Sequence, residues 1–137
     1  NHNIISDIFK QLPLDGPIII HNKYAIRDFV YISDVIDFIS KLIPNIIGGI
    51  FNVGSGHARN WNDLAKAIFF AMGKKIHIEY IDMPSAIINQ YQYHTCSETQ
   101  KILNSGYSDP VMSLEEGIAD YVRQYLILGK HLGSRAT

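Results

Sequence analysis

Hydrophobic residues in the first part of the chain alternate between helical and strand-like spacing. Apolar residues at helical intervals predict a helix over 3–12, and the β-branched run at 18–20 predicts a short buried strand. A second strand is expected over 28–32, and Ser33 is expected to cap the helix that follows it. A third strand is expected over 50–53, where it leads into a glycine-containing turn.

The second part of the chain continues this alternation. Asn60 is a suitable N-cap for a helix that Gly73 ends, and residues 76–81 alternate as a strand does. Two closing helices are predicted by capping-box spacing, namely Ser97 with Gln100 and Ser113 with Glu116. Strands that alternate with helices predict an α/β fold with some parallel pairing. Strands as apolar as these need other elements packed on both faces of their sheet. The predicted helices are too few and too short to cover both faces.

Composition supports a folded domain and indicates that part of its surface is normally covered. The chain has 137 residues, enough for one domain with a core, and hydrophobic residues make up 47% of it, which excludes a disordered tail. Charged residues make up 18%, below the roughly 25% that is usual for a soluble domain. The first residue is Asn1 rather than Met, so residues 1–137 are expected to be a single fragment or a processed product.

Charge and cysteine content exclude several classes of function. Twelve Lys and Arg against thirteen Asp and Glu give a net charge of −1, so the basic excess typical of nucleic-acid binders is absent. The longest apolar stretches fall short of the ~18 residues that span a membrane. The single cysteine, Cys96, cannot form an intramolecular disulfide. A cytoplasmic protein with neither nucleic acid nor membrane as partner is therefore expected.

No complete catalytic, cofactor or metal motif is found in the sequence. The strand and turn over 51–56 superficially resemble a dinucleotide fingerprint, but Arg59 and Asn60 stand where its third glycine should be, so a tight turn is the better interpretation. No Tyr is followed four residues later by Lys, and the six histidines show no metal-ligand spacing. We therefore expect no catalytic, cofactor-binding or metal-binding residue in this chain.

Arg27 is a candidate for binding an anion. It follows a polar loop and precedes a buried strand, and an arginine fixed there can present its planar guanidinium to a phosphate. Lys23 would add positive charge. A structural salt bridge from Arg27 to Asp28 or Asp34 is the alternative, and both remain open. The second polar and aromatic cluster, over 91–93, is more typical of partly buried packing than of a ligand site.

Three longer motifs stand out: R-D-F-V-Y-I-S-D-V over 27–35, I-F-N-V-G-S-G over 50–56 and S-L-E-E-G-I over 113–118. They resemble, in the same order, motifs of the extended short-chain dehydrogenase/reductases that act on nucleotide sugars. The resemblance runs from about residue 4 to residue 126. It implies an α/β fold in which the chain is the C-terminal, substrate-binding portion of a Rossmann-type enzyme, including one strand–helix unit of the parent sheet.

A second set of motifs narrows the resemblance, namely I-E-Y-I-D-M-P over 78–84, Tyr91-Gln92 with Thr95, and Gly106-Tyr107. This set is similar to the ADP-L-glycero-D-manno-heptose 6-epimerases. Sugar 4-epimerases and many 4,6-dehydratases carry a diphosphate-binding Arg ahead of an Asp in this region, whereas here no Arg lies between Arg59 and Arg123.

The resemblance implies both an activity and a set of binding residues. The family interconverts ADP-heptose epimers at C6 by transient oxidation and reduction of the sugar with tightly bound NADP, or alternatively NAD. The residues implied to bind the nucleotide-diphosphate sugar are Arg27, Tyr91, Ile20, His21, Asn22 and Lys23. The loop that contains the last four residues is one residue shorter than the family's F-x-G-S loop and lacks its glycine, so the sugar remains open.

The family's catalytic and cofactor-binding motifs lie upstream of the matched region. Both the glycine fingerprint and the catalytic Tyr-x-x-x-Lys would belong to an N-terminal NAD(P)-binding Rossmann part that these 137 residues do not include. The chain alone is therefore expected to be inactive, and a homo-oligomer is expected for the parent enzyme or through exposed apolar strands. Two alternatives remain: another nucleotide-sugar 4-epimerase or dehydratase of the same superfamily, and a non-catalytic interaction domain.

Overall fold

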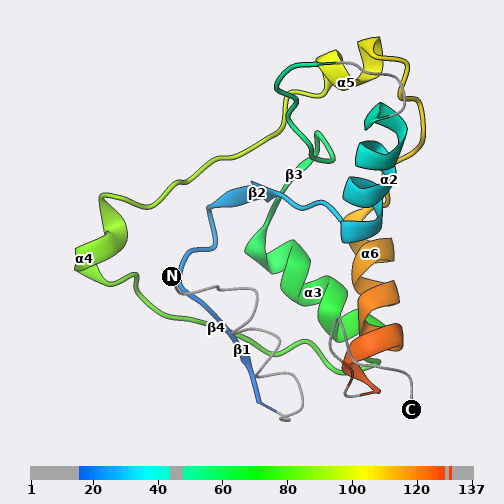
Figure 1. Cartoon of the computed structure of the whole chain (residues 1–137). Helices are drawn as coiled ribbons and strands as arrows, with labels where there is room; N and C mark the ends of the chain where they lie inside the picture. Colours follow the sequence, from blue (N-terminus) through cyan, green and yellow to red (C-terminus); the bar gives the residue numbers. More distant parts are fainter. Residues whose placement is uncertain (1–15, 44–47, 129, 131–137) are drawn as a thin grey trace.

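The structure is a computed structural model that describes residues 16–43, 48–128 and 130. In chain order its elements are β1 (Ile18–Ile20), β2 (Ile26–Asp28), α2 (Ile32–Leu42), β3 (Ala58–Asn60), α3 (Trp61–Ala71), β4 (Ile78–Tyr80), α4 (Ser85–Ile88), α5 (Gln100–Asn104), α6 (Leu114–Tyr121) and the π-helical turn η2 (Val122–Leu126). Helices α2, α5 and α6 lie on one side of the molecule, and α3 lies between them and the strands (Figure 1). The helix predicted over 3–12 falls outside the described residues.

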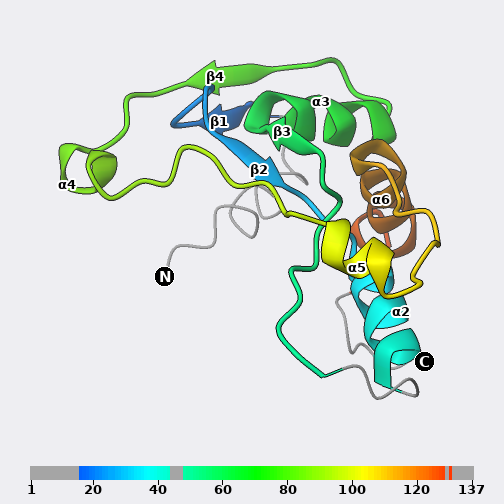
Figure 2. The same cartoon turned by 90° about the horizontal axis from the view of Figure 1, so that it is seen from above.

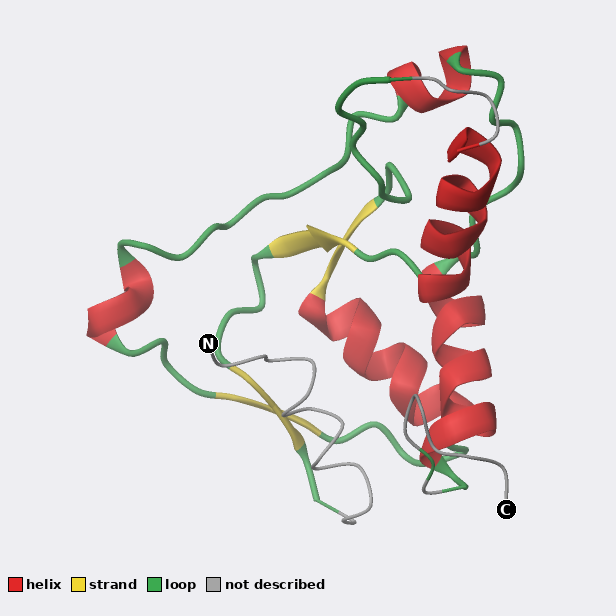
Figure 3. Ribbon diagram, viewed as in Figure 1, coloured by secondary structure: helices red, strands yellow, loops and turns green. Residues whose placement is uncertain are grey.

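The strands of the described residues form two separate two-stranded sheets (Figure 3). β1 pairs in parallel with β4, so that Ile18 lies opposite Ile78, and β2 pairs antiparallel with β3. The β1–β4 pair confirms the expected parallel pairing. The strands predicted at 18–20 and within 76–81 are also confirmed.

Helix α3 lies at the centre of the hydrophobic core. It packs against β1 on one side and along α6 and η2 on the other (Figure 1). Its inward face supplies Leu64, Ala65 and Ile68, whose exposed fractions are 2%, 0% and 0%. Ile18 of β1 and Val122 of η2 close the core around these side chains. Burial of one apolar helix face on both neighbours is what the helical spacing of the sequence requires.

Two predicted helix caps are confirmed. The Asn60 side chain accepts a hydrogen bond from the Asp63 N–H at 2.9 Å, and the Asp63 carboxylate accepts one from the Asn60 N–H at 3.3 Å. Ser113 and Glu116 form the same reciprocal pair at the start of α6. At its other end α3 stops before Gly73, whose φ of 64° lies in the left-handed region that favours glycine.

The predictions of the second strand and of the helix cap that follows it are wrong. The strand covers Ile26–Asp28 instead of 28–32, and α2 already begins at Ile32, so Ser33 lies inside the helix and does not cap it. The N-cap residue is Tyr31, whose side chain makes no capping bond. A strand forms where its backbone can hydrogen-bond to a neighbouring strand. Because β3 lies opposite residues 26–28, the strand forms there.

Two further predictions are wrong for the same kind of reason. Residues 50–53 do not form a strand, because no strand within the described ranges lies beside them to complete a hydrogen-bonded ladder. Ile50 is left 87% exposed. The helix predicted to be capped at Ser97 begins at Gln100, and the Ser97 backbone N–H is bound instead by the side chain of Asp28.

Helix α4 stands apart from α2, α5 and α6, on the far side of the strands (Figures 1 and 2). The chain between β4 and α5 therefore makes a long excursion, and its returning part runs back past β2 (Figure 2). Among the described residues, no helix is both long and apolar enough to cross a membrane.

Candidate functional site

The predicted binding residues Arg27 and Tyr91 are brought together where β2 meets the segment that returns from α4. The Ile26 N–H donates to the Tyr93 carbonyl at 2.9 Å, and the Thr95 N–H donates to the Ile26 carbonyl at 3.2 Å. These two backbone bonds hold Arg27 beside the returning segment, although the two are far apart in sequence. The site therefore depends on a pairing that local sequence patterns do not reveal.

The Arg27 guanidinium lies over the Tyr91 ring, with its Cζ atom 5.1 Å from the ring centroid. Its Nη1 N–H donates to the Ile26 carbonyl at 2.8 Å, and an Nη2 N–H donates to the Gln92 carbonyl. A guanidinium carries five N–H donors, so these two bonds orient the group without using all of them. Neutral groups thus position the cation, and donors remain for an anionic ligand.

A salt bridge from Arg27 to either neighbouring aspartate is not formed, so that alternative is wrong. The Asp28 carboxylate accepts from Ser55, and the Asp34 carboxylate accepts from the Met112 N–H at 3.1 Å. Within residues 16–43, 48–128 and 130, no carboxylate pairs with Arg27. A half-buried guanidinium without a carboxylate partner is suited to bind an anion that comes from outside the chain.

Tyr91 is held between two aromatic neighbours. The Trp61 indole N–H donates to the Tyr91 hydroxyl oxygen at 3.1 Å. The Tyr93 ring meets the Tyr91 ring edge-on, with a centroid distance of 5.5 Å and an interplanar angle of 77°. Tyr91 also packs against the hydrophobic core. The expected partly buried packing of this cluster is therefore confirmed for Tyr91, and the same packing fixes the ring under Arg27.

The loop predicted to bind the sugar begins with a buried residue. Ile20 is 3% exposed and packs in the core, and its carbonyl accepts the Ile81 N–H at 3.1 Å. The structure therefore does not present the Ile20 side chain at the surface. Asn22 shapes the loop, because its Oδ1 atom accepts the N–H groups of Tyr24 and Ala25 at 2.8 and 3.1 Å.

The remaining two loop residues, His21 and Lys23, are exposed. The Lys23 ammonium lies 5.2 Å from the Tyr24 ring centroid and 5.6 Å from the Tyr80 ring centroid, so it is in range of both π faces. This places a second cation at the carboxyl ends of β1 and β4, in the loop that leads to β2. The structure brings Arg27 and Tyr91 into contact, whereas neither residue forms a hydrogen bond, ion pair or ring contact with His21, Asn22 or Lys23.

Asp28, which follows Arg27, organises a turn that the sequence analysis considered as a cofactor loop. Its Oδ1 atom accepts the Ser55 N–H at 2.8 Å and the Ser55 hydroxyl at 2.5 Å. Its Oδ2 atom accepts the N–H groups of Gly56 at 3.0 Å and Ser97 at 2.8 Å. Burial alone would raise the pKa of Asp28, but these hydrogen bonds outweigh it and lower that pKa below its usual range.

The glycine turn does not fit a nicotinamide dinucleotide. Such a ligand places its pyrophosphate on free backbone amides, and here the amides of Ser55 and Gly56 are already bound by the Asp28 carboxylate. A Cβ atom on Gly54 would lie 2.5 Å from Asp28 Oδ2 and 2.5 Å from the Ser97 Cβ, so this glycine serves close packing of the turn. These contacts favour the tight-turn interpretation.

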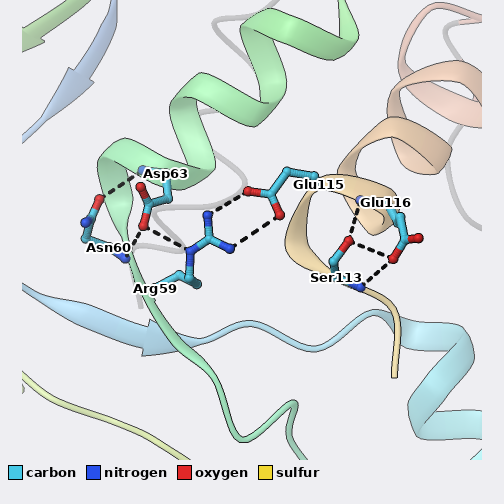
Figure 4. A network of polar contacts seen from close by, with 6 residues as sticks. All are labelled: Arg59, Asn60, Asp63, Ser113, Glu115 and Glu116. Carbon is cyan, nitrogen blue, oxygen red and sulfur yellow. Dashed lines mark hydrogen bonds and ion pairs between the residues drawn. The ribbon is translucent and has the colours of Figure 1, made fainter. Parts of the chain in front are cut away.

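A second polar network, missed by the sequence analysis, joins the first turns of α3 and α6 (Figure 4). The Arg59 Nε–H donates to Asp63 at 3.1 Å, and both terminal nitrogens donate to the Glu115 carboxylate at 3.3 and 2.6 Å. The hydrogen bonds from Arg59 hold the pKa of Glu115 below its usual range. Because every charge in this network has a partner, we assign it a structural role.

Three cavities of about 680, 360 and 220 Å³ lie elsewhere in the described part of the chain. The largest lies between α3 and α6, beside Arg59, and neither Arg27 nor Tyr91 lines any of the three. No group of three or more His, Cys, Asp or Glu side chains within the described ranges could hold a metal ion.

Solved structures of nucleotide-sugar enzymes share this fold. UDP-glucuronic acid 4-epimerase from Bacillus cereus aligns with a TM-score of 0.67 at 26% identity, covering 85% of this chain and 38% of that chain. ADP-L-glycero-D-manno-heptose-6-epimerase from Helicobacter pylori aligns with a TM-score of 0.69 at 27% identity, covering 88% and 36%. The chain thus has the α/β fold of the extended short-chain dehydrogenase/reductases, as the sequence motifs implied.

The sequence comparison is more specific. The chain is 42% identical over 111 residues to an ADP-L-glycero-D-manno-heptose-6-epimerase from Nitratidesulfovibrio vulgaris (strain DP4), a match that covers 77% of this chain and 34% of that protein. It is thus homologous to the C-terminal part of these epimerases and spans about a third of their length. No protein-family model matches the chain.

Proposed function

We propose that the chain is the substrate-binding part of a nucleotide-sugar epimerase whose substrate is ADP-glycero-manno-heptose. One observation carries the proposal: the Arg27 guanidinium lies over the Tyr91 ring, oriented by two carbonyls and paired with no carboxylate in the described part of the chain. A planar guanidinium with donors to spare can bind a diphosphate through paired hydrogen bonds. The choice of ADP as the nucleotide and heptose as the sugar rests on the homology to ADP-heptose epimerases.

In this proposal the residues of the chain bind and orient the sugar nucleotide. Arg27 holds the diphosphate, Tyr91 contributes its ring and hydroxyl, and the loop residues His21, Asn22 and Lys23 border the ligand. The transient oxidation and re-reduction of the sugar is the chemistry that NADP, or NAD, supplies when bound. Because the Gly54–Gly56 turn does not fit a dinucleotide, we assign that group to residues outside the chain and expect the chain alone to catalyse no epimerisation.

Calorimetric titration of the chain with ADP-heptose, UDP-glucose and NADP tests the proposal. We expect binding of ADP-heptose and weaker or no binding of the other two. Arg27→Gln should weaken ADP-heptose binding about ten- to a hundredfold, because a hydrogen bond to a charged group is worth about 1.5–3 kcal/mol. Arg123→Gln is the matched control, because Arg123 is an exposed arginine on η2, away from this site.

Two results of this titration would contradict the proposal. If the Arg27→Gln variant binds ADP-heptose as tightly as the unchanged chain does, Arg27 does not hold the diphosphate. If UDP-glucose binds more tightly than ADP-heptose, the alternative of another nucleotide-sugar epimerase or dehydratase is favoured over the heptose epimerase.

A second candidate function is a non-catalytic interaction domain that pairs with a second copy of itself. Helix α2 and its C-cap residue Ile43 present a stripe of four isoleucines to solvent, with exposed fractions between 46% and 71%: Ile32, Ile36, Ile39 and Ile43. They recur at alternating intervals of four and three residues, the spacing of a coiled-coil seam. The flanking positions carry no charge that would repel a second copy, being Ser33, Val35, Ser40 and Leu42. Light scattering over a range of chain concentrations tests this candidate, since a monomer at all concentrations would exclude it.

A further inference from the structure

Trp61, the first residue of α3, donates the hydrogen bond that fixes the hydroxyl group of Tyr91. An indole N–H can only donate, so the Tyr91 oxygen is the acceptor in this bond, and the hydroxyl proton of Tyr91 must point elsewhere. Within residues 16–43, 48–128 and 130, no acceptor takes that proton. The bond therefore leaves Tyr91 with a donor that is available to an outside group.

The Trp61 side chain is well placed to hold this orientation. It is 7% exposed, and its ring meets that of Phe29 edge-on, with a centroid distance of 5.4 Å and an interplanar angle of 77°. The backbone that carries it is fixed in turn by the reciprocal cap between Asn60 and Asp63. A rigid N–H donor on a capped helix restricts the orientation of a neighbouring hydroxyl group more than a water molecule does. Water can also accept the hydroxyl proton, whereas an indole N–H cannot.

We infer that Trp61 is a positioning residue for anion binding: it turns the Tyr91 hydroxyl into a donor toward an oxygen of the ligand that Arg27 holds. This inference rests on the proposed function, because it needs a nucleotide-diphosphate sugar at Arg27. The guanidinium over the ring and the hydroxyl at its rim would then supply two kinds of donor to one anionic group. Trp61 itself does not touch the ligand.

A double-mutant cycle on ADP-heptose affinity tests this inference. Trp61→Phe keeps an aromatic ring against Phe29 but removes the N–H, and we expect about two- to tenfold weaker binding, the range for one neutral hydrogen bond. Tyr91→Phe should weaken binding at least as much. In the Tyr91→Phe background, Trp61→Phe should have no further effect, because the hydroxyl that it orients is gone.

Nuclear magnetic resonance gives a second test that does not depend on a Trp61 variant folding. The chain contains one tryptophan, so its single indole N–H signal reports Trp61. We expect Tyr91→Phe to shift this signal upfield in the free chain. We also expect ADP-heptose to shift it in the unchanged chain and to leave it in place in the Tyr91→Phe variant.

The outcomes separate this inference from the proposed function. If the unchanged chain does not bind ADP-heptose, both fail. If Arg27→Gln weakens binding but Trp61→Phe does not, the proposed function stands and the role of Trp61 is overturned. If Trp61→Phe weakens binding equally with and without the Tyr91 hydroxyl, Trp61 acts through the fold, and the inference is also overturned.

Discussion

Replacing Asp28 with asparagine removes one negative charge from a site where four hydrogen bonds converge on a single carboxylate. Asparagine keeps one acceptor oxygen and replaces the other with an NH₂ group. Two of the four donors, for example the N–H groups of Gly56 and Ser97, would then face a donor instead of an acceptor. We expect the strand β2, the 54–56 turn and the segment before α5 to loosen together, because this carboxylate joins all three.

The magnitude follows from the number of bonds lost. A hydrogen bond to a charged group contributes about 1.5–3 kcal/mol, and losing two at a half-buried site should lower the free energy of unfolding by about 3 kcal/mol. That is a large part of the roughly 5–15 kcal/mol by which domains are usually stable. Urea unfolding followed by the fluorescence of Trp61 measures it. Asp82→Asn, the same change at an exposed residue, should cost less than about 0.5 kcal/mol.

The pH dependence gives the same prediction a second test. Because hydrogen bonds lower the pKa of Asp28 in the folded chain, its stabilisation is fully present above the unfolded pKa, about 3.9, and is lost as the pH falls through the folded pKa. The stability difference between the unchanged chain and Asp28→Asn should therefore be constant from pH 7 to 5 and shrink below about pH 4. A difference under about 0.5 kcal/mol at pH 7, or one that grows on acidification, would refute the reasoning.

Two other substitutions test the packing and the second polar network. Gly54→Ala should lower the free energy of unfolding by about 1–3 kcal/mol, because its Cβ would lie 2.5 Å from Asp28 Oδ2, whereas Gly48→Ala, with no atom within 4 Å, should have little effect in the same urea experiment. Arg59→Gln should cost about 1 kcal/mol, a modest value because the Arg59 and Glu115 side chains are partly exposed, and raising the salt concentration to 1 M should reduce that cost. A cost for Arg59→Gln that is independent of salt would contradict the assignment of these bonds as ion pairs.

Features that depend on a few neighbouring residues could be predicted from the sequence. The cap at Asn60 was found because asparagine is a favoured N-cap residue, and the cap at Ser113 because a capping box is complete within four residues. The same spacing at Ser97 and Gln100 caps no helix, since the Ser97 backbone N–H is bound by Asp28. The strand at 18–20 and helix α3 were found because their hydrophobic spacing is strong and local. The same reasoning predicted the second strand over 28–32, because the sequence is hydrophobic over 29–32. The observed strand ends at Asp28, because β3 pairs only with residues 26–28.

Features that depend on contacts between distant segments could not be predicted in this way. The donors to Asp28 lie up to 69 residues away in sequence, and nothing in the local pattern identifies them. Arg27 and Tyr91 were paired through family resemblance, and the structure supplies the reason for their contact in the bonds between Ile26 and the returning segment. The Trp61 bond was missed because an isolated tryptophan at a helix start is typical of packing.

The most direct test of the account locates bound ADP-heptose on the isotopically labelled chain by nuclear magnetic resonance. The account predicts that the signals of β2, of residues 91–95 and of the Arg27 guanidinium shift with added ligand, while those of α6 stay in place. Shifts confined to the α3–α6 groove, or no shifts at a ligand concentration of several millimolar, would contradict the claim that this chain binds a nucleotide sugar at Arg27.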